Sequence, residues 1–118
     1  MEIRVKRVYD APAAEDGFRV LVDGVWPRGL TKEEAHIDLW LREAAPSTAL
    51  RQWFSHDPER WTEFRDRYFQ ELDQHPEVVR RLLSYATQGV LTLLFSARNR
   101  EHNQAVALRE YLLQRIRR

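Results

Sequence analysis

The sequence contains no cysteine. This absence excludes disulfides, zinc sites with thiolate ligands and cysteine nucleophiles, and it fits a reducing compartment. Long apolar runs are also missing. The first ten residues, MEIRVKRVYD, alternate charged and apolar side chains, unlike the continuous apolar segment of a signal peptide. We therefore expect a soluble, cytoplasmic protein that does not associate with membranes.

Glycine is scarce, with four residues in the chain, and there is neither a P-loop nor a G-x-G-x-x-G segment to cradle a dinucleotide. The four histidines lack the H-x-x-x-H or H-E-x-x-H spacing of metal ligands. Large cofactors and metal sites are therefore not expected. Neither sign of charge is in large excess. The net charge is +1, which provides no global field to attract nucleic acid.

The sequence does contain enough apolar residues to form a core. A chain of 118 residues, 43% of them hydrophobic, is typical of one domain with one modest core. No repeat, linker or low-complexity tract divides it, so residues 1–118 are expected to form a single domain.

Three segments are predicted to be strands. Residues 2–9 place Ile3 and Val5 on one face with a period of two, whereas residues 20–22 and 90–97 are continuous apolar runs typical of strands buried on both faces. Helical patterns separate these strands, which indicates a mostly parallel or mixed sheet of few strands, covered by about five helices, in an α/β fold.

The helices are predicted from their start signals. Thr31 and Glu34 form a Thr-x-x-Glu capping box for a helix expected to run to about Ala44. Ser47 caps a short helix, and Asp57-Pro58 begins an amphipathic helix with an exposed Glu63–Arg67 pair. Pro76 starts another helix that ends near Gly89, and a last amphipathic helix follows the segment RNREHN.

Ligands of α/β sheets bind where the strands end. Two strand ends here are rich in polar side chains, and these converge if the two strands are neighbours. The first group comprises Asp23, Trp26 and Arg28; the second comprises Ser96, Arg98, Asn99, His102 and Asn103.

The arginines favour an anionic ligand. Arg28 lies between a rigid proline and a permissive glycine, so its guanidinium can be held out for bidentate contact with a carboxylate or phosphate. Arg98 adds positive charge near the start of the last helix. Alternatively, Arg28 forms an internal ion pair with Asp23 or a nearby glutamate.

The other candidates also have two interpretations. Asp23 is either a general base or a cap of the turn at Gly24, and Trp26 either stacks on a ligand ring or packs beside the strand. His102, with Asn99 and Asn103, could orient a substrate or move a proton; otherwise Asn99 caps the last helix and His102 lies on its surface.

Four segments carry a family resemblance: KRVYD, DGFRVLVDGVWPRGL, DLWLREAAPSTALRQWFSHDPERWTEFRDRY and LTLLFSARNREHNQAVALREYL. They resemble the YeaO-like family of small bacterial proteins, a domain of unknown function. The resemblance carries over at Asp23, Trp26, Pro27, Arg28 and Gly29, and at Ser96, His102 and Asn103. Gly24 stands where the family commonly has arginine. If that arginine matches ligand charge, this protein should bind a less anionic ligand, or bind it more weakly.

These patterns favour a protein that binds or processes a small anionic metabolite, phosphorylated or nucleotide-like; whether it is an enzyme stays open. One alternative is a nucleic-acid accessory domain that uses the basic C-terminal segment REYLLQRIRR, which the near-neutral charge disfavours. Another is a protein-interaction module, such as a homodimer that buries surplus aromatics. These aromatics are Trp40, Trp53, Phe54 and Phe69.

Overall fold

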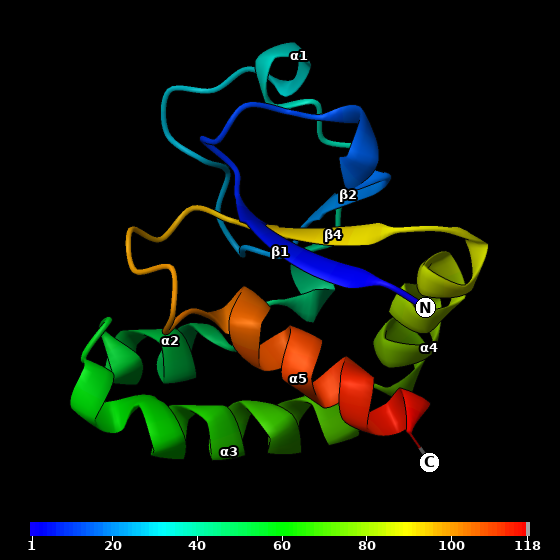
Figure 1. Cartoon of the computed structure of the whole chain (residues 1–118). Helices are drawn as coiled ribbons and strands as arrows, with labels where there is room; N and C mark the ends of the chain where they lie inside the picture. The colour runs from blue at the N-terminus through cyan, green and yellow to red at the C-terminus, as the bar shows by residue number, and fades with distance from the viewer. Residues whose placement is uncertain (118) are drawn as a thin grey trace.

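The computed structural model, which describes residues 1–117, has a four-stranded parallel sheet at its centre (Figure 1). The strands are β1 (Ile3–Arg7), β2 (Phe18–Leu21), β3 (Leu39–Trp40) and β4 (Leu91–Phe95), in the order β1-β4-β2-β3. The first strand and the two apolar runs are confirmed as strands, as is the α/β fold. β4 pairs with both β1 and β2, so all five of its side chains are buried.

Five α-helices surround the sheet: α1 (Lys32–Ala35), α2 (Thr48–Phe54), α3 (Trp61–Asp73), α4 (Pro76–Gln88) and α5 (Gln104–Ile116). Short 3-10 turns occupy Ala14–Asp16, Arg42–Ala44 and Pro58–Arg60. Ser47 Oγ accepts the N–H of Leu50 at 3.1 Å, as its predicted capping role requires. Asp57 caps the 3-10 turn that precedes α3, accepting the N–H of Glu59, so the regular helix begins later than its start signal suggests.

The helix predicted from Thr31 to about Ala44 is wrong in length. Thr31 and Glu34 do form the capping box, but α1 ends after Ala35, where His36 adopts a left-handed conformation with φ 50°. Asp38 then exchanges hydrogen bonds with the backbone of Arg19. These bonds draw Leu39 into register beside Val20. Ala35 and Leu39 have the i, i+4 spacing of a helix, but pairing with the open edge of β2 overrides this local pattern.

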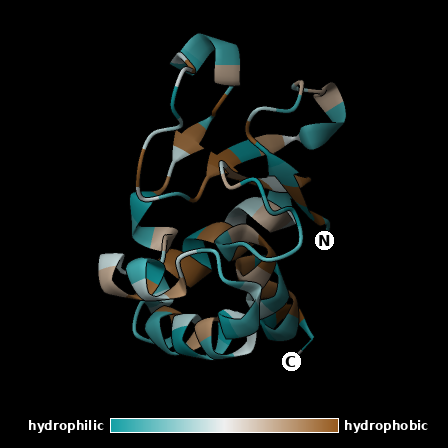
Figure 2. Cartoon of the chain, turned by 90° about the vertical axis from the view of Figure 1, so that its left-hand side faces the viewer, coloured by the Kyte–Doolittle hydropathy of each residue, from teal (hydrophilic) through white to brown (hydrophobic). Residues whose placement is uncertain are grey.

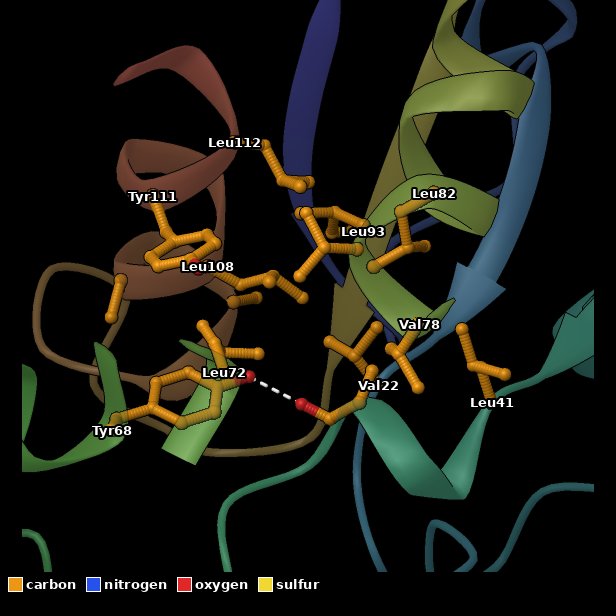
Figure 3. Close-up of a cluster of buried hydrophobic side chains, with 14 of the residues drawn as sticks. Val22, Leu41, Tyr68, Leu72, Val78, Leu82, Leu93, Leu108, Tyr111 and Leu112 are labelled. Atoms are coloured by element: carbon orange, nitrogen blue, oxygen red, sulfur yellow. Dashed lines mark hydrogen bonds between the residues drawn. The ribbon is translucent and has the colours of Figure 1, made fainter. Parts of the chain in front are cut away.

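The main core lies between the sheet and the layer containing α2, α3, α4 and α5. Figure 3 shows leucine and valine side chains from α3, α4 and α5 gathered with Leu93 of β4, with Tyr68 and Tyr111 at one side of the cluster. Figure 2 shows that the helical surfaces facing away from the sheet are mainly hydrophilic. The amphipathic helices therefore bury their apolar stripes against the sheet, as their sequence patterns require.

The opposite face of the sheet has a second, smaller core and a buried polar network. Val8, Leu21, Ala35, Ile37 and Leu94 form the apolar part under α1. Beside it, the Arg19 guanidinium donates to Asp16 Oδ2 at 2.5 Å and to the carbonyl of Ala35 at 2.9 Å.

Lys6 Nζ also donates to Asp16, at 3.0 Å, and Thr92 Oγ1 donates to the Asp16 carbonyl at 2.6 Å. These bonds tie three neighbouring strands to the loop before β2. Over the described residues, no helix combines the length and apolar character needed to cross a membrane.

Candidate functional site

The two polar strand ends predicted from the sequence lie next to each other. β2 and β4 are parallel neighbours, and the N–H of Val22 continues their pairing by donating to the Leu94 carbonyl at 3.1 Å. In Figure 1 the loop after β4 leaves the sheet on the left, the side that Figure 2 views. A cavity of about 1160 Å³ lies at these strand ends. Its lining includes seven of the predicted residues: Asp23, Trp26, Arg28, Ser96, Arg98, Asn99 and Asn103.

Asp23 joins the two strand ends. Its Oδ2 accepts the backbone N–H of Ser96 at 2.9 Å, and its Oδ1 accepts a hydrogen bond from the side-chain amide of Gln104 at the start of α5. The carboxylate is therefore directed to the loop after β4 and not to its own turn. Burial raises the pKa of Asp23, although Ser96, Gln104 and the nearby Arg51 act in the opposite direction.

Four arginines line the cavity: Arg7, Arg28, Arg51 and Arg98. Arg7 is anchored, since its Nε donates to the Ala97 carbonyl at 3.0 Å and its guanidinium lies 4.7 Å from the centre of the Tyr9 ring. Tyr9 also donates its hydroxyl to the Arg28 carbonyl at 2.7 Å, which fixes the backbone of the WPRG turn. Arg7 and Tyr9 thus brace one wall of the cavity.

Arg28 and Arg98 are exposed at the cavity. Among residues 1–117, none of the ion pairs includes either side chain. The internal pair considered for Arg28, with Asp23 or a glutamate, is therefore not formed. Both guanidinium groups remain available to an anion from solvent.

Trp26 is held from both sides. Its indole N–H donates to the Leu30 carbonyl at 2.7 Å, and its ring meets Trp40 edge-on with 5.3 Å between ring centroids. Trp40 in turn donates to the Asp23 carbonyl at 2.7 Å. Trp26 thus packs against the second core while one part of it borders the cavity.

The cap of the last helix is Asn103 and not Asn99. Asn103 Oδ1 accepts the N–H of Val106 at 3.0 Å, and its amide donates to the Asn99 carbonyl at 2.9 Å. Asn99 caps the preceding turn, accepting the N–H groups of Glu101 and His102. The His102 ring packs against the Trp61 ring, with 5.1 Å between the ring centroids, and it does not line the cavity. The asparagines are thus engaged in shaping the loop.

The family described as the inactive DUF488-N3 subclade matches residues 2–118. The chain is 43% identical over 112 residues to the uncharacterised protein YeaO of Escherichia coli K12, covering 95% of this chain and 97% of that protein. The chain belongs to this YeaO-like family. The uncharacterised proteins Rv3073c of Mycobacterium tuberculosis H37Rv and Mb3100c of Mycobacterium bovis are each 36% identical to it over 110 residues, covering 93% of this chain and 92% of each relative. No solved structure shows a significant match.

Position 24 departs from the pattern that the resemblance assigns to the YeaO-like family, where arginine is common. A Cβ on Gly24 would lie 2.8 Å from Arg51 Nη1. Arg51 of α2 therefore brings a guanidinium to the space beside Gly24, so that this member of the family has a cation near position 24 from another element.

Sequence patterns alone do not indicate Arg51 or Gln104, because each lies on a helix whose placement depends on tertiary packing. Arg7 has a local signal, since it lies in the strand predicted over residues 2–9 and is the last residue of β1, which pairs with β4. Within residues 1–117 no three His, Asp or Glu side chains gather in a way that could hold a metal ion. The chemistry of the cavity is that of guanidinium groups around one carboxylate.

Proposed function

We propose that this protein binds a small anionic metabolite, phosphorylated or nucleotide-like, in the cavity at the carboxyl ends of β2 and β4, and that it does not transform this ligand. The observation that carries the proposal is the charge of the lining, where four arginines face one carboxylate, Asp23. Guanidinium groups match phosphate and carboxylate oxygens in bidentate geometry, which makes this lining suitable for such an anion.

The size of the cavity supports a metabolite larger than a bare anion. Its volume of about 1160 Å³ slightly exceeds the roughly 300–1,000 Å³ typical of ligand pockets. Apolar side chains also contribute to the lining. Tyr9 is 39% exposed and Val25 is 62% exposed, although large hydrophobic residues are usually covered. A ligand with an apolar face would cover part of both side chains.

Two observations favour binding without catalysis. The matching family is described as an inactive subclade. In addition, the His102 ring lies against Trp61 and outside the lining of the cavity that contains Asp23. A general acid–base pair needs both groups within hydrogen-bonding reach of the reacting atoms, which this arrangement of Asp23 and His102 does not provide.

The alternatives predicted from the sequence find less support. The basic residues of α5 make contacts within the protein: Arg109 donates to the Ile3 carbonyl at 2.6 Å, and Arg115 pairs with Asp73 at 2.6 Å. For an interface of surplus aromatics, Trp53 is covered by Arg60 and Arg67, and Phe54 is 4% exposed. These four side chains are thus engaged within the protein, whereas Arg117 of the basic segment is exposed and Arg118 lies outside the described residues.

A thermal-shift titration tests the proposal, with inorganic phosphate and nucleoside monophosphates as probes. A ligand that binds only the folded protein stabilises it by about 2.7 kcal/mol at one hundred times its Kd, so the melting temperature should rise by several degrees. Arg28→Ala and Arg98→Ala should each reduce this rise while their melting temperatures without ligand stay near that of the unaltered protein.

Arg80→Ala is the matched control, because Arg80 is an exposed arginine of α4 outside the cavity lining. It should respond to the probes as the unaltered protein does. A flat response of the unaltered protein to all probes would contradict the proposed function. Equal losses of response in Arg28→Ala and Arg80→Ala would show that general surface charge, not the cavity, attracts the anion.

A further inference from the structure

A carboxylate lies in the lining of a cavity that is otherwise basic. Asp23 is the one acidic side chain of that lining within residues 1–117. For a site that bound only an anion this group would be unfavourable, because like charges repel. A ligand that also carries a hydrogen-bond donor would offset this repulsion by donating to Asp23.

Asp23 has acceptor capacity left for such a donor. An ionised carboxylate offers about four lone-pair sites. Within the described residues the Ser96 N–H and the Gln104 amide each use one site, and the Ser96 hydroxyl is also close enough to lower the pKa of the carboxyl, which leaves part of the acceptor capacity free. The carboxylate is half-buried and borders the cavity, so its remaining sites can accept hydrogen bonds from a bound molecule.

We infer that the ligand is a phosphorylated polyol, such as a sugar phosphate or a nucleotide, whose hydroxyl groups donate to Asp23 while its phosphate contacts Arg28 and Arg98. This inference rests on the proposed function and specifies its ligand class. A neutral hydroxyl suits the position better than an ammonium group, because four guanidinium groups line the same cavity and would repel a second cation.

The cavity also has suitable groups for the rest of such a molecule. Tyr9 and Val25 are exposed where they border it, and they can cover the apolar face of a sugar ring or a base. The carboxylate, the basic groups and the apolar surface thus correspond to the three kinds of group that a sugar phosphate or nucleotide carries.

Calorimetric titration with matched small ligands tests the inference on the unaltered protein. Glycerol 3-phosphate and n-propyl phosphate share a three-carbon chain and a phosphate, but only the first carries free hydroxyls. A hydrogen bond to a charged group is worth more than one to a neutral group, and glycerol 3-phosphate should bind about tenfold more tightly. O-phosphoethanolamine, which carries an ammonium group, should bind more weakly than glycerol 3-phosphate.

Asp23→Asn should remove most of the preference for hydroxyls without weakening n-propyl phosphate binding, because a negative charge leaves the cavity. The asparagine retains one acceptor, and the Gln104 amide can turn to pair with the new NH₂ group, so the fold should persist. Arg28→Ala should show the opposite pattern and weaken the binding of glycerol 3-phosphate and of n-propyl phosphate by similar factors.

The outcomes separate this inference from the proposed function. If both phosphates bind the unaltered protein equally well, Asp23 does not recognise hydroxyls and the inference is overturned, while the anion site stands. Tighter binding of O-phosphoethanolamine would overturn it in favour of ammonium recognition. If no phosphate binds, inorganic phosphate included, the proposed function fails together with the inference. The ligand comparison needs no variant, so a misfolded Asp23→Asn protein would leave the test intact.

Discussion

Arg51 Nη1 lies 2.8 Å from the position that a Cβ on Gly24 would occupy. Gly24 follows Asp23 at the end of β2, and Arg51 belongs to α2, so the contact joins the sheet to the helical layer beside the cavity. The small residue makes space for the large cation. Because the obstructing atom is the far end of a flexible side chain, the contact governs where Arg51 lies more than how the backbone folds.

Gly24→Ala should therefore weaken anion binding without unfolding the protein. The added methyl group displaces the Arg51 guanidinium, so phosphate affinity should fall, in the same direction as in Arg51→Ala but by less. Losing one charge-assisted contact in Arg51→Ala should cost about tenfold or more. Phosphate titration of both variants, with unfolding curves as a check on the fold, measures the two effects.

Gly89→Ala is the control for this comparison, because a Cβ at Gly89 has no atom within 4 Å. Its phosphate affinity should equal that of the unaltered protein. An unchanged affinity in both Gly24→Ala and Arg51→Ala would show that Arg51 does not contact the anion.

Asp16→Asn should strongly destabilise the folded protein. Asp16 is 4% exposed and neutralises Arg19, which is also 4% exposed, on the sheet face opposite α2, α3, α4 and α5. Removing one partner leaves a buried charge uncompensated, at a cost of about 3–5 kcal/mol in the free energy of unfolding. Urea unfolding at neutral pH measures the loss. Asp66→Asn, at an exposed position on α3, should change stability by less than about 0.5 kcal/mol.

The same network predicts an acid-sensitive component of stability. Burial alone would raise the pKa of Asp16, but hydrogen bonds from Lys6, the Ala13 N–H and Arg19 together lower it. A lowered folded-state pKa contributes stability above the ordinary carboxyl pKa of about 3.9, and this contribution is lost as the pH falls further. Stability curves of Asp16→Asn should therefore be flatter below about pH 4 than those of the unaltered protein. Parallel curves would contradict this role for Asp16.

The difference between β3 and the other strands shows which elements the sequence can predict. Residues 91–95 are buried on both faces, and such strands are continuous apolar runs that local pattern reveals. β3 has two residues, Leu39 and Trp40, and exists because the edge of β2 offers free backbone groups. A pairing between segments that are distant in sequence leaves no local pattern, so the capping box at Thr31 suggested a longer helix.

The residues that line the cavity also differ in whether the sequence can predict them. The segments that follow β2 and β4 contain Asp23, Arg28, Ser96 and Arg98, and the parallel pairing of the two strands brings these segments together. Arg51 reaches the cavity only because α2 packs across the turn at Gly24. Its contribution depends on the three-dimensional arrangement of two elements, which helix periodicity does not specify.

Asn103→Ala should lower stability through the start of α5. Asn103 is 1% exposed, accepts the Val106 N–H and donates to the Asn99 carbonyl. Losing a helix cap costs about 0.5–2 kcal/mol, and the half-buried Asn99 carbonyl loses its donor as well. Asn103→Asp should recover part of the loss, because a carboxylate can accept the Val106 N–H and is favoured at a helix N-terminus. Equal instability of the two variants in urea would argue against the capping role.

Tyr68→Phe should destabilise the main core although it removes a single oxygen. The Tyr68 ring is fully buried among the side chains in Figure 3, and its hydroxyl donates to the carbonyl of Ala44. Phenylalanine leaves that buried carbonyl without its donor, which costs about 1–3 kcal/mol. Tyr85→Phe is the matched control, because the Tyr85 hydroxyl pairs with Arg81 at the surface and its loss should cost less.

The pH dependence of stability gives an independent measurement of how burial affects the ionisation of the Tyr68 hydroxyl. Burial raises the pKa of its hydroxyl far above the ordinary value. The unfolded chain releases this proton near pH 10 and the folded protein retains it, so stability falls as the pH rises above about 10. The Tyr68→Phe variant lacks this difference in proton binding. The unfolding free energy of the variant should therefore fall less steeply above about pH 10 than that of the unaltered protein. Equal slopes for the two proteins would show that Tyr68 ionises in the folded protein as easily as in the unfolded chain.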